Sequence, residues 1–125
     1  MEYYIVDSFA TKLFKGNPAG VCVLDRRIPL ELMQKIAEEN NLPETAFVVK
    51  GKGNYELRWF TPKAEIDLCG HATLAAAYVI SNFIDVNVKK IDFFTQSGKL
   101  EVTRNGNLYE MIFPEIMPIE IELSP

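Results

Sequence analysis

The chain has 125 residues, 48% of them hydrophobic, and carries 13 basic and 17 acidic side chains for a formal net charge of -4. This length and apolar content suffice for one core, so we expect a single domain over residues 1–125. A net negative chain has no broad positive field for a phosphate backbone, which argues against nucleic acid as a partner.

Membrane and secretory features are not predicted. The longest apolar stretch, residues 72–80, is far shorter than the roughly 20 residues that span a bilayer. Two cysteines are too few for a disulfide framework, and no charged segment followed by an apolar one opens the chain. We therefore expect a cytoplasmic location, reduced thiols and no membrane partner.

The first third of the chain predicts two strands and one helix. Residues 3–9 and 20–24 are rich in β-branched and aromatic side chains, and a turn-rich segment at 15–18 separates them. Apolar residues then recur at helical spacing over 29–40, with a proline suited to the first turn and asparagines suited to the stop. This helix is amphipathic.

The middle third predicts a hairpin followed by a buried helix. Residues 46–49 and 55–60 have strand composition, and the two glycines and the asparagine of 50–54 supply the conformations of a hairpin turn. Over 71–83, alanines mix with larger apolar residues and leave almost no polar face. A helix of this kind must be surrounded by protein, so we expect it at the centre of the domain.

The last third predicts three further strands, at 90–95, 99–104 and 108–113, with turns at 97–98 and 105–107. The dipeptide Asn105-Gly106 is a strong hairpin signal. The sheet's inner face and an apolar helix each require cover, so the element order favours a mostly antiparallel sheet curled around one helix. The predicted fold class is α+β.

Glu44 is the first residue that could carry chemistry. It follows Pro43 and comes directly before a strand of apolar residues, which would place its carboxylate in a partly dry setting. Such a setting disfavours the charged form and suits a group that accepts and returns a proton. A solvated turn residue without a chemical role is the alternative.

A second candidate site lies at the expected start of the buried helix, where free backbone N–H groups and the helix dipole favour an anion. Gly70 would let a ligand approach the backbone. His71, the only histidine, could donate to a substrate carboxylate or hydroxyl, or could be a capping or packed residue. Cys69 is either an activated thiolate or a buried structural cysteine. With one histidine, a metal site would need unusual partners.

Other features are assigned to packing. Cys22 stands between two valines and is expected in the core. Trp59 and Phe60 are expected in the core or at an interface. The glycine-containing segment 16–20 lacks both the P-loop lysine and the three-glycine dinucleotide spacing, so no nucleotide cofactor is expected.

Four segments together resemble successive signatures of the PhzF-like family of phenazine-biosynthesis isomerases. They stand in the family's order and extend from the first predicted strand nearly to the C-terminus. The segments are FKGNPAGV (14–21), NLPETAF (41–47), LCGHATLA (68–75) and TQSGKL (95–100).

The resemblance implies a diaminopimelate-epimerase-like fold with two similar halves, each a barrel-like sheet around a central helix, and an active site between them. It also implies cofactor-independent proton transfer on a small cyclic or amino-acid-like carboxylate, as in the isomerisation of a dihydro-hydroxyanthranilate. Glu44 matches the acid/base of that family. Gly70 and His71 match its substrate-contacting pair, and Asp67 and Cys69 border the same pocket.

Two departures from the family pattern matter. Pro43 stands where many members have a serine, so a hydroxyl beside the glutamate is missing. The substrate can therefore differ from the phenazine precursor. Family members are also roughly twice as long, beyond the single-domain size expected here, so this chain resembles their N-terminal half. A homodimer, a separately encoded second half, or a truncated, non-catalytic binding or structural module would each account for the length.

Overall fold

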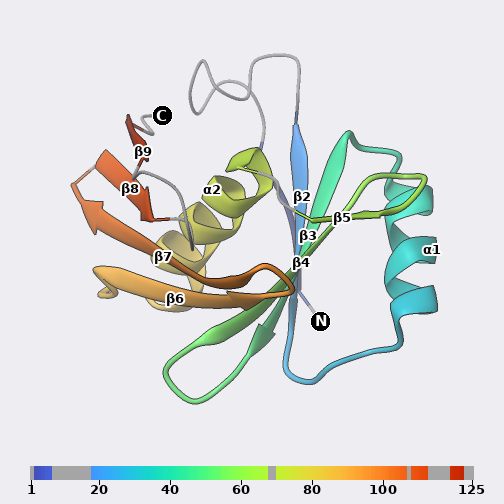
Figure 1. Cartoon of the computed structure of the whole chain (residues 1–125), viewed down its shortest axis with the longest axis horizontal. Helices are drawn as coiled ribbons and strands as arrows, with labels where there is room; N and C mark the ends of the chain where they lie inside the picture. The colour runs from blue at the N-terminus through green and yellow to red at the C-terminus, as the bar shows by residue number, and fades with distance from the viewer. Residues whose placement is uncertain (1, 7–17, 68–69, 107, 113–118, 123–125) are drawn as a thin grey trace.

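The computed structural model describes residues 2–6, 18–67, 70–106, 108–112 and 119–122 (Figure 1). The elements follow in the order β1 (Glu2–Val6), β2 (Ala19–Leu24), α1 (Leu30–Asn40), β3 (Glu44–Lys50), β4 (Tyr55–Phe60), β5 (Glu65–Ile66), α2 (Gly70–Val79), the π-helical segment η3 (Ile80–Ile84), β6 (Lys90–Thr95), β7 (Gly98–Asn105), β8 (Leu108–Ile112) and β9 (Ile119–Glu122). The predicted α+β class is confirmed.

The strands form one mixed sheet in the order β1-β2-β3-β4-β6-β7-β8-β9, with the short β5 paired to β4. Two neighbouring pairs, β2 with β3 and β4 with β6, are parallel, and the remaining pairs are antiparallel. Parallel neighbours require a crossover connection. The helices supply it, since α1 connects β2 to β3 and α2 lies in the connection from β4 to β6.

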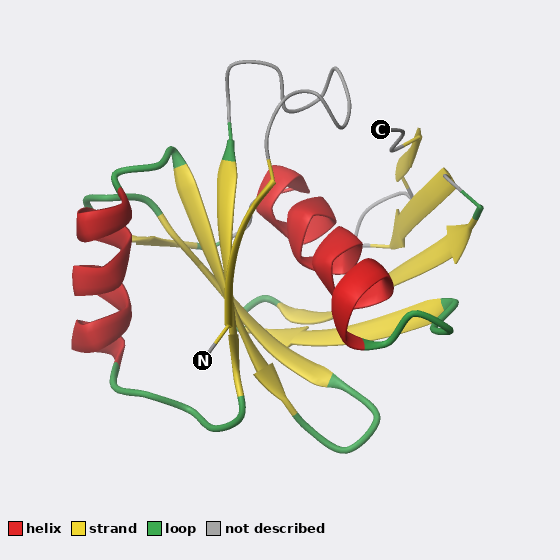
Figure 2. Cartoon of the chain, turned by 180° about the vertical axis from the view of Figure 1, so that it is seen from behind, coloured by secondary structure: helices red, strands yellow, loops and turns green. Residues whose placement is uncertain are grey.

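The two helices lie on opposite faces of the sheet (Figure 2). On β3 successive side chains point to opposite faces. Ala46 and Val48 belong to the large core cluster that includes α2, whereas Phe47 belongs to a smaller cluster with Met33 and Ala37 of α1. The helix α2 is therefore the central one, as its composition predicts.

The sheet is strongly twisted, and α2 lies across one of its faces (Figure 1). The described strands form an open path that begins at β1 and ends at β9. A mostly antiparallel sheet with a central apolar helix is confirmed, whereas barrel-like closure of that sheet stays a prediction.

Helix and turn ends follow local sequence signals. The helix α1 stops at Asn41, which adopts a left-handed conformation with a φ of 51° and donates its N–H to the carbonyl of Ala37. Glycines at the hairpin turns have positive φ, 76° at Gly53 and 67° at Gly106. The predicted helix 71–83 is α-helical only to Val79 and continues as the π-helical η3.

Some predicted boundaries differ from the observed ones. The strand predicted at 3–9 is described as Glu2–Val6, and residues 7–9 lie outside the described residues. The strand predicted at 46–49 already begins at Glu44. Two strands were not predicted: β5 has two residues, too few for a pattern, and β9 has four. No helix in the described ranges has the length and apolar character needed to cross a membrane.

Candidate active site

Glu44 is the first residue of β3, and it pairs in register with Ala19 of the parallel strand β2. Its side chain is 14% exposed. Strand alternation puts it on the same face as Ala46, which is the face that α2 covers. The carboxylate therefore lies on the α2 side of the sheet, in a strand that begins two residues earlier than predicted.

His71 lies in the first turn of α2, and its side chain is 36% exposed. Its Nδ1 atom is 3.7 Å from Oε1 of Glu44. That separation is within reach of an ion pair when the imidazole is protonated, but it exceeds the 2.7–3.2 Å typical of an N–H···O hydrogen bond. The tertiary structure thus brings the two predicted site residues together from different elements.

Gly70 is the first residue of α2. A Cβ atom built there would meet only the Cε atom of Met111, at 3.8 Å, which is an ordinary van der Waals contact. Packing of the described residues does not require a glycine at this position. A glycine here is compatible with a ligand that approaches the positive end of the dipole of α2.

The remaining two predicted site residues are placed differently. Asp67 is exposed and follows β5, three residues before α2, and its backbone carbonyl accepts a hydrogen bond of 3.1 Å from Ser97 Oγ. Ser97 was not predicted to contact this loop, although it lies in the fourth family-like segment. Cys69 lies outside the described residues. The roles of Asp67 and Cys69 stay predictions.

The residues assigned to packing are in the core. Cys22 is fully buried, and burial raises the pKa of its thiol to about 12, so it is a small apolar residue rather than a nucleophile. Trp59 and Phe60 are each 2% exposed, which confirms the core interpretation. The indole of Trp59 also donates a 3.0 Å hydrogen bond to Oγ1 of Thr73 on α2, a contact that no sequence pattern indicated.

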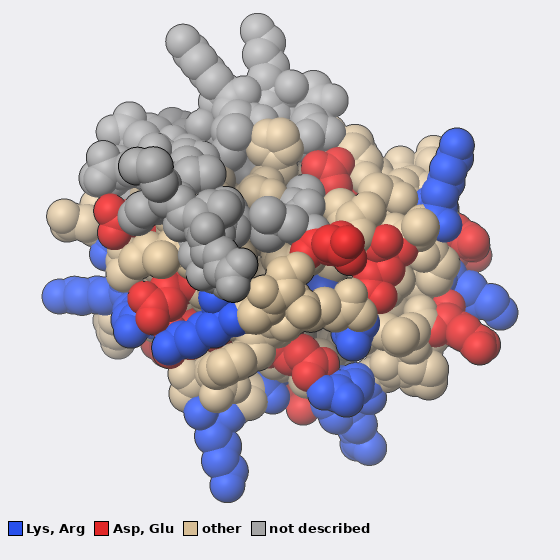
Figure 3. Space-filling model, in the orientation of Figure 1, with Lys and Arg blue, Asp and Glu red and all other residues tan. Residues whose placement is uncertain are grey.

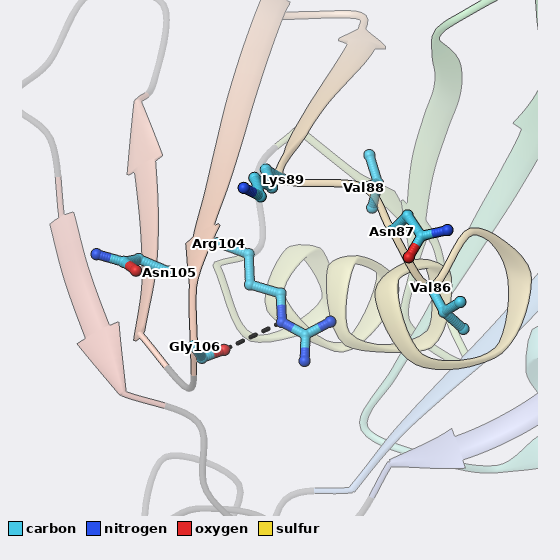
Figure 4. A pocket seen from close by; sticks show the side chains of 7 residues that line it. All are labelled: Val86, Asn87, Val88, Lys89, Arg104, Asn105 and Gly106. Carbon is cyan, nitrogen blue, oxygen red and sulfur yellow. Dashed lines mark hydrogen bonds between the residues drawn. The ribbon is translucent and has the colours of Figure 1, made fainter.

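A different hollow lies between the loop after η3 and the β7–β8 turn (Figure 4). Its volume is about 340 Å³, and Lys89 and Arg104 are its basic lining residues. The guanidinium of Arg104 donates to the carbonyls of Gly106 and Ser81, both at 3.0 Å, so it supports the end of the helical run. None of the predicted site residues lines this pocket.

The acidic, cysteine and histidine side chains of the described residues bear on metal binding, and one face of the molecule shows the distribution of charge. Among those residues, no three histidine, cysteine, aspartate or glutamate side chains are grouped so that they could hold a metal ion. Basic and acidic side chains are interspersed over the described part of the face in Figure 3. That face carries no broad positive surface of the kind that binds nucleic acid.

Comparison with known proteins gives the family. The profile of the PhzC-PhzF family, described as phenazine biosynthesis-like protein, matches residues 6–123. An uncharacterized isomerase of Pseudomonas aeruginosa is 54% identical over 118 residues, which are 94% of this chain and 46% of that protein.

Solved structures agree with this result. A PhzF-family phenazine biosynthesis protein of Enterococcus faecalis superposes with a TM-score of 0.80 at 55% identity, over 94% of this chain and 46% of that one. A predicted epimerase of Pseudomonas aeruginosa shares the fold, with a TM-score of 0.67 at 23% identity, over 87% of this chain and 41% of that one. The chain spans about half the length of the relatives it matches. It belongs to the PhzC-PhzF family of phenazine biosynthesis-like proteins.

Proposed function

We propose that this chain is part of an isomerase in which Glu44 transfers a proton on a small cyclic or amino-acid-like carboxylate. The observation that carries the proposal is that Oε1 of Glu44, on β3, lies 3.7 Å from Nδ1 of His71, at the start of α2. A similar protein of Pseudomonas aeruginosa bears the name isomerase, which supports the reaction class.

The proposed step is a proton shift. The Glu44 carboxylate takes a proton from a substrate carbon and returns it at another position, so that no electrons are gained or lost overall. Gly70 and His71 at the start of α2 hold the substrate carboxylate, and the helix dipole stabilises the negative charge that develops. This chemistry requires neither a metal nor a nucleotide cofactor.

We propose further that a second domain or subunit completes the site. A proton transfer of this kind needs water excluded from the reacting atoms, and residues on one side of a cleft cannot do this. The second half would be a further domain, a second copy of this chain, or a separately encoded subunit. In such an assembly the sheet would form one barrel-like half of a diaminopimelate-epimerase-like fold, located in the cytoplasm.

The test begins with the mass of the 14.2 kDa chain in solution by light scattering, because it decides which assembly to assay. A dimer is assayed as it is, and a monomer is assayed after its second half has been added. The assembled protein is incubated in D₂O with small cyclic and amino-acid-like carboxylates, and deuterium incorporation is followed by mass spectrometry.

Glu44→Gln is the decisive variant, because it removes the proton carrier and keeps the shape of the side chain. Loss of general acid/base catalysis should slow deuterium exchange by about 10²–10⁴-fold. Glu39→Gln, at an exposed position of α1, is the matched control and should exchange at the wild-type rate. Unchanged exchange in Glu44→Gln would exclude Glu44 as the acid/base.

A second candidate function is a non-catalytic binding or structural module. The chain matches 46% of the isomerase to which it is similar, and a site built from this part alone would bind a carboxylate without enclosing it. This function predicts that the wild-type assembly binds carboxylates without catalysing exchange. Calorimetric binding together with an absence of deuterium incorporation would select it.

A further inference from the structure

The helical run formed by α2 and η3 is held to the sheet mainly by apolar contacts. Apolar contacts are not directional, so they specify the rotation and the axial position of a helix on the sheet less sharply than hydrogen bonds do. The buried residues of α2 are Ala72, Thr73, Leu74, Ala75, Ala76, Ala77 and Val79. Something more directional is needed to fix where the first turn of this helix lies.

Two buried hydroxyls on this run provide directional contacts. Thr73 and Ser81 are at most 1% exposed, and each forms a hydrogen bond with an aromatic side chain of the sheet. Trp59 Nε1 donates to Thr73 Oγ1 at 3.0 Å, and Ser81 Oγ lies 2.9 Å from the hydroxyl of Tyr109. Thr73 and Ser81 stand eight positions apart, which is about two helical turns, so the run is attached near both of its ends.

The Trp59–Thr73 hydrogen bond lies at the end that carries the candidate site. Trp59 pairs across the sheet with Ala46, which stands two residues after Glu44 on the same strand face. Thr73 stands two residues after His71 on α2. The bond therefore connects β4, the strand next to the one that presents Glu44, to the helical turn that presents His71.

We propose that Trp59 and Thr73 are positioning residues that set the separation of Glu44 and His71. The Ser81–Tyr109 contact anchors the distant end of the same run and does not set this separation. The consequence for catalysis rests on the proposed function. The geometric consequence does not, because it concerns only where the His71 ring lies.

The experiment uses the fact that His71 is the only histidine in the chain. Its ring ¹H and ¹⁵N signals are recorded at one fixed pH for the wild type and for Glu44→Gln, which shows the signals without the carboxylate. Thr73→Val keeps the side-chain shape and removes the hydroxyl. We expect it to move the His71 signals toward those of Glu44→Gln.

Two further variants separate positioning from general loosening. Thr73→Ser restores the hydroxyl and should return the His71 signals to their wild-type positions. Ser81→Ala removes the matched hydroxyl at the distant end and should leave them in place. Wild-type His71 signals in Thr73→Val, or an equal change in Ser81→Ala, would overturn the proposal.

If Thr73→Val fails to fold, Trp59→Phe replaces it, with Tyr109→Phe as its matched control, and the same two outcomes decide. In an active assembly, a misplaced site should lower kcat by up to about 10²-fold while KM changes less. Retained exchange in Glu44→Gln would end the proposed function, whereas the His71 signals judge the positioning separately.

Discussion

The two faces of the sheet are covered by helices of opposite character. On one face, α1 buries Met33 and Ala37 and leaves most of its surface in water. On the other face, α2 is surrounded by protein and buries seven of its ten residues. The sequence pattern of a helix with one buried stripe shows which side faces the core, whereas a helix that is apolar all round is oriented by its neighbours. The candidate site lies at the start of α2, which is apolar all round.

The largest expected difference between the faces concerns matched leucines on the two helices. Leu74 of α2 is fully buried, whereas Leu32 of α1 is 45% exposed. Leu74→Ala should lower the free energy of unfolding by about 2–5 kcal/mol, because it removes buried atoms and leaves a cavity. Leu32→Ala should change it by less than about 0.5 kcal/mol. Urea unfolding curves measure both, and similar losses would contradict the contrast.

Cys22 belongs to the smaller core cluster with Met33 and Ala37 of α1, and it should make the stability of the fold depend on pH in the alkaline range. Burial raises the pKa of its thiol from 9.0 to about 12, so between these values the folded state keeps a proton that the unfolded state loses. Its stabilising contribution is complete below pH 9 and declines as the pH rises, by up to about 1.4 kcal/mol per pH unit.

Stability measured at a series of alkaline pH values checks this prediction for Cys22. Cys22→Ala is the control, and its free energy of unfolding should fall less steeply above pH 9. Equal slopes in the two proteins would show that the thiol titrates alike in the folded and unfolded states. Thiol alkylation of Cys22 in the native protein should likewise be slow until unfolding.

The end of α1 should depend on the conformation of a single residue. Asn41 has a φ of 51°, which β-branched side chains adopt only with strain. Asn41→Val should therefore cost about 1–2 kcal/mol of stability, whereas Asn41→Gly should be nearly neutral. Thermal or urea unfolding distinguishes the two variants. Equal behaviour of valine and glycine would mean that the helix can end elsewhere.

A substitution at the first residue of α2, Gly70, should increase stability rather than lower it. Gly70→Ala meets only an ordinary contact with Met111, and alanine restricts the unfolded chain, so stability should rise by about 0.5–1 kcal/mol. If a ligand approaches this backbone, as proposed, the same variant should bind carboxylates more weakly. Lower stability would instead indicate that the glycine is needed for packing.

Local signals predicted much of the fold. The turn at 50–54, the hairpin signal at Asn105-Gly106 and the asparagine stop of α1 depend on backbone conformations that particular residues favour, and they lie where the sequence puts them. The parallel pairs β2–β3 and β4–β6 were not predicted. An apolar strand pattern specifies which face is buried, but it does not specify the neighbouring strand.

Periodicity and composition are properties of neighbours along the chain, so they were enough to predict the fold class, the buried character of α2 and the residue types available for chemistry. The proximity of Glu44 and His71 and the hydrogen bond from Trp59 to Thr73 arise from the tertiary structure. These contacts join β3, β4 and α2. Their distances depend on how the strands pair and on where α2, whose surface is apolar on all sides, lies on the sheet. The apolar pattern of α2 does not specify its orientation on the sheet, and directional hydrogen bonds between distant segments can specify it.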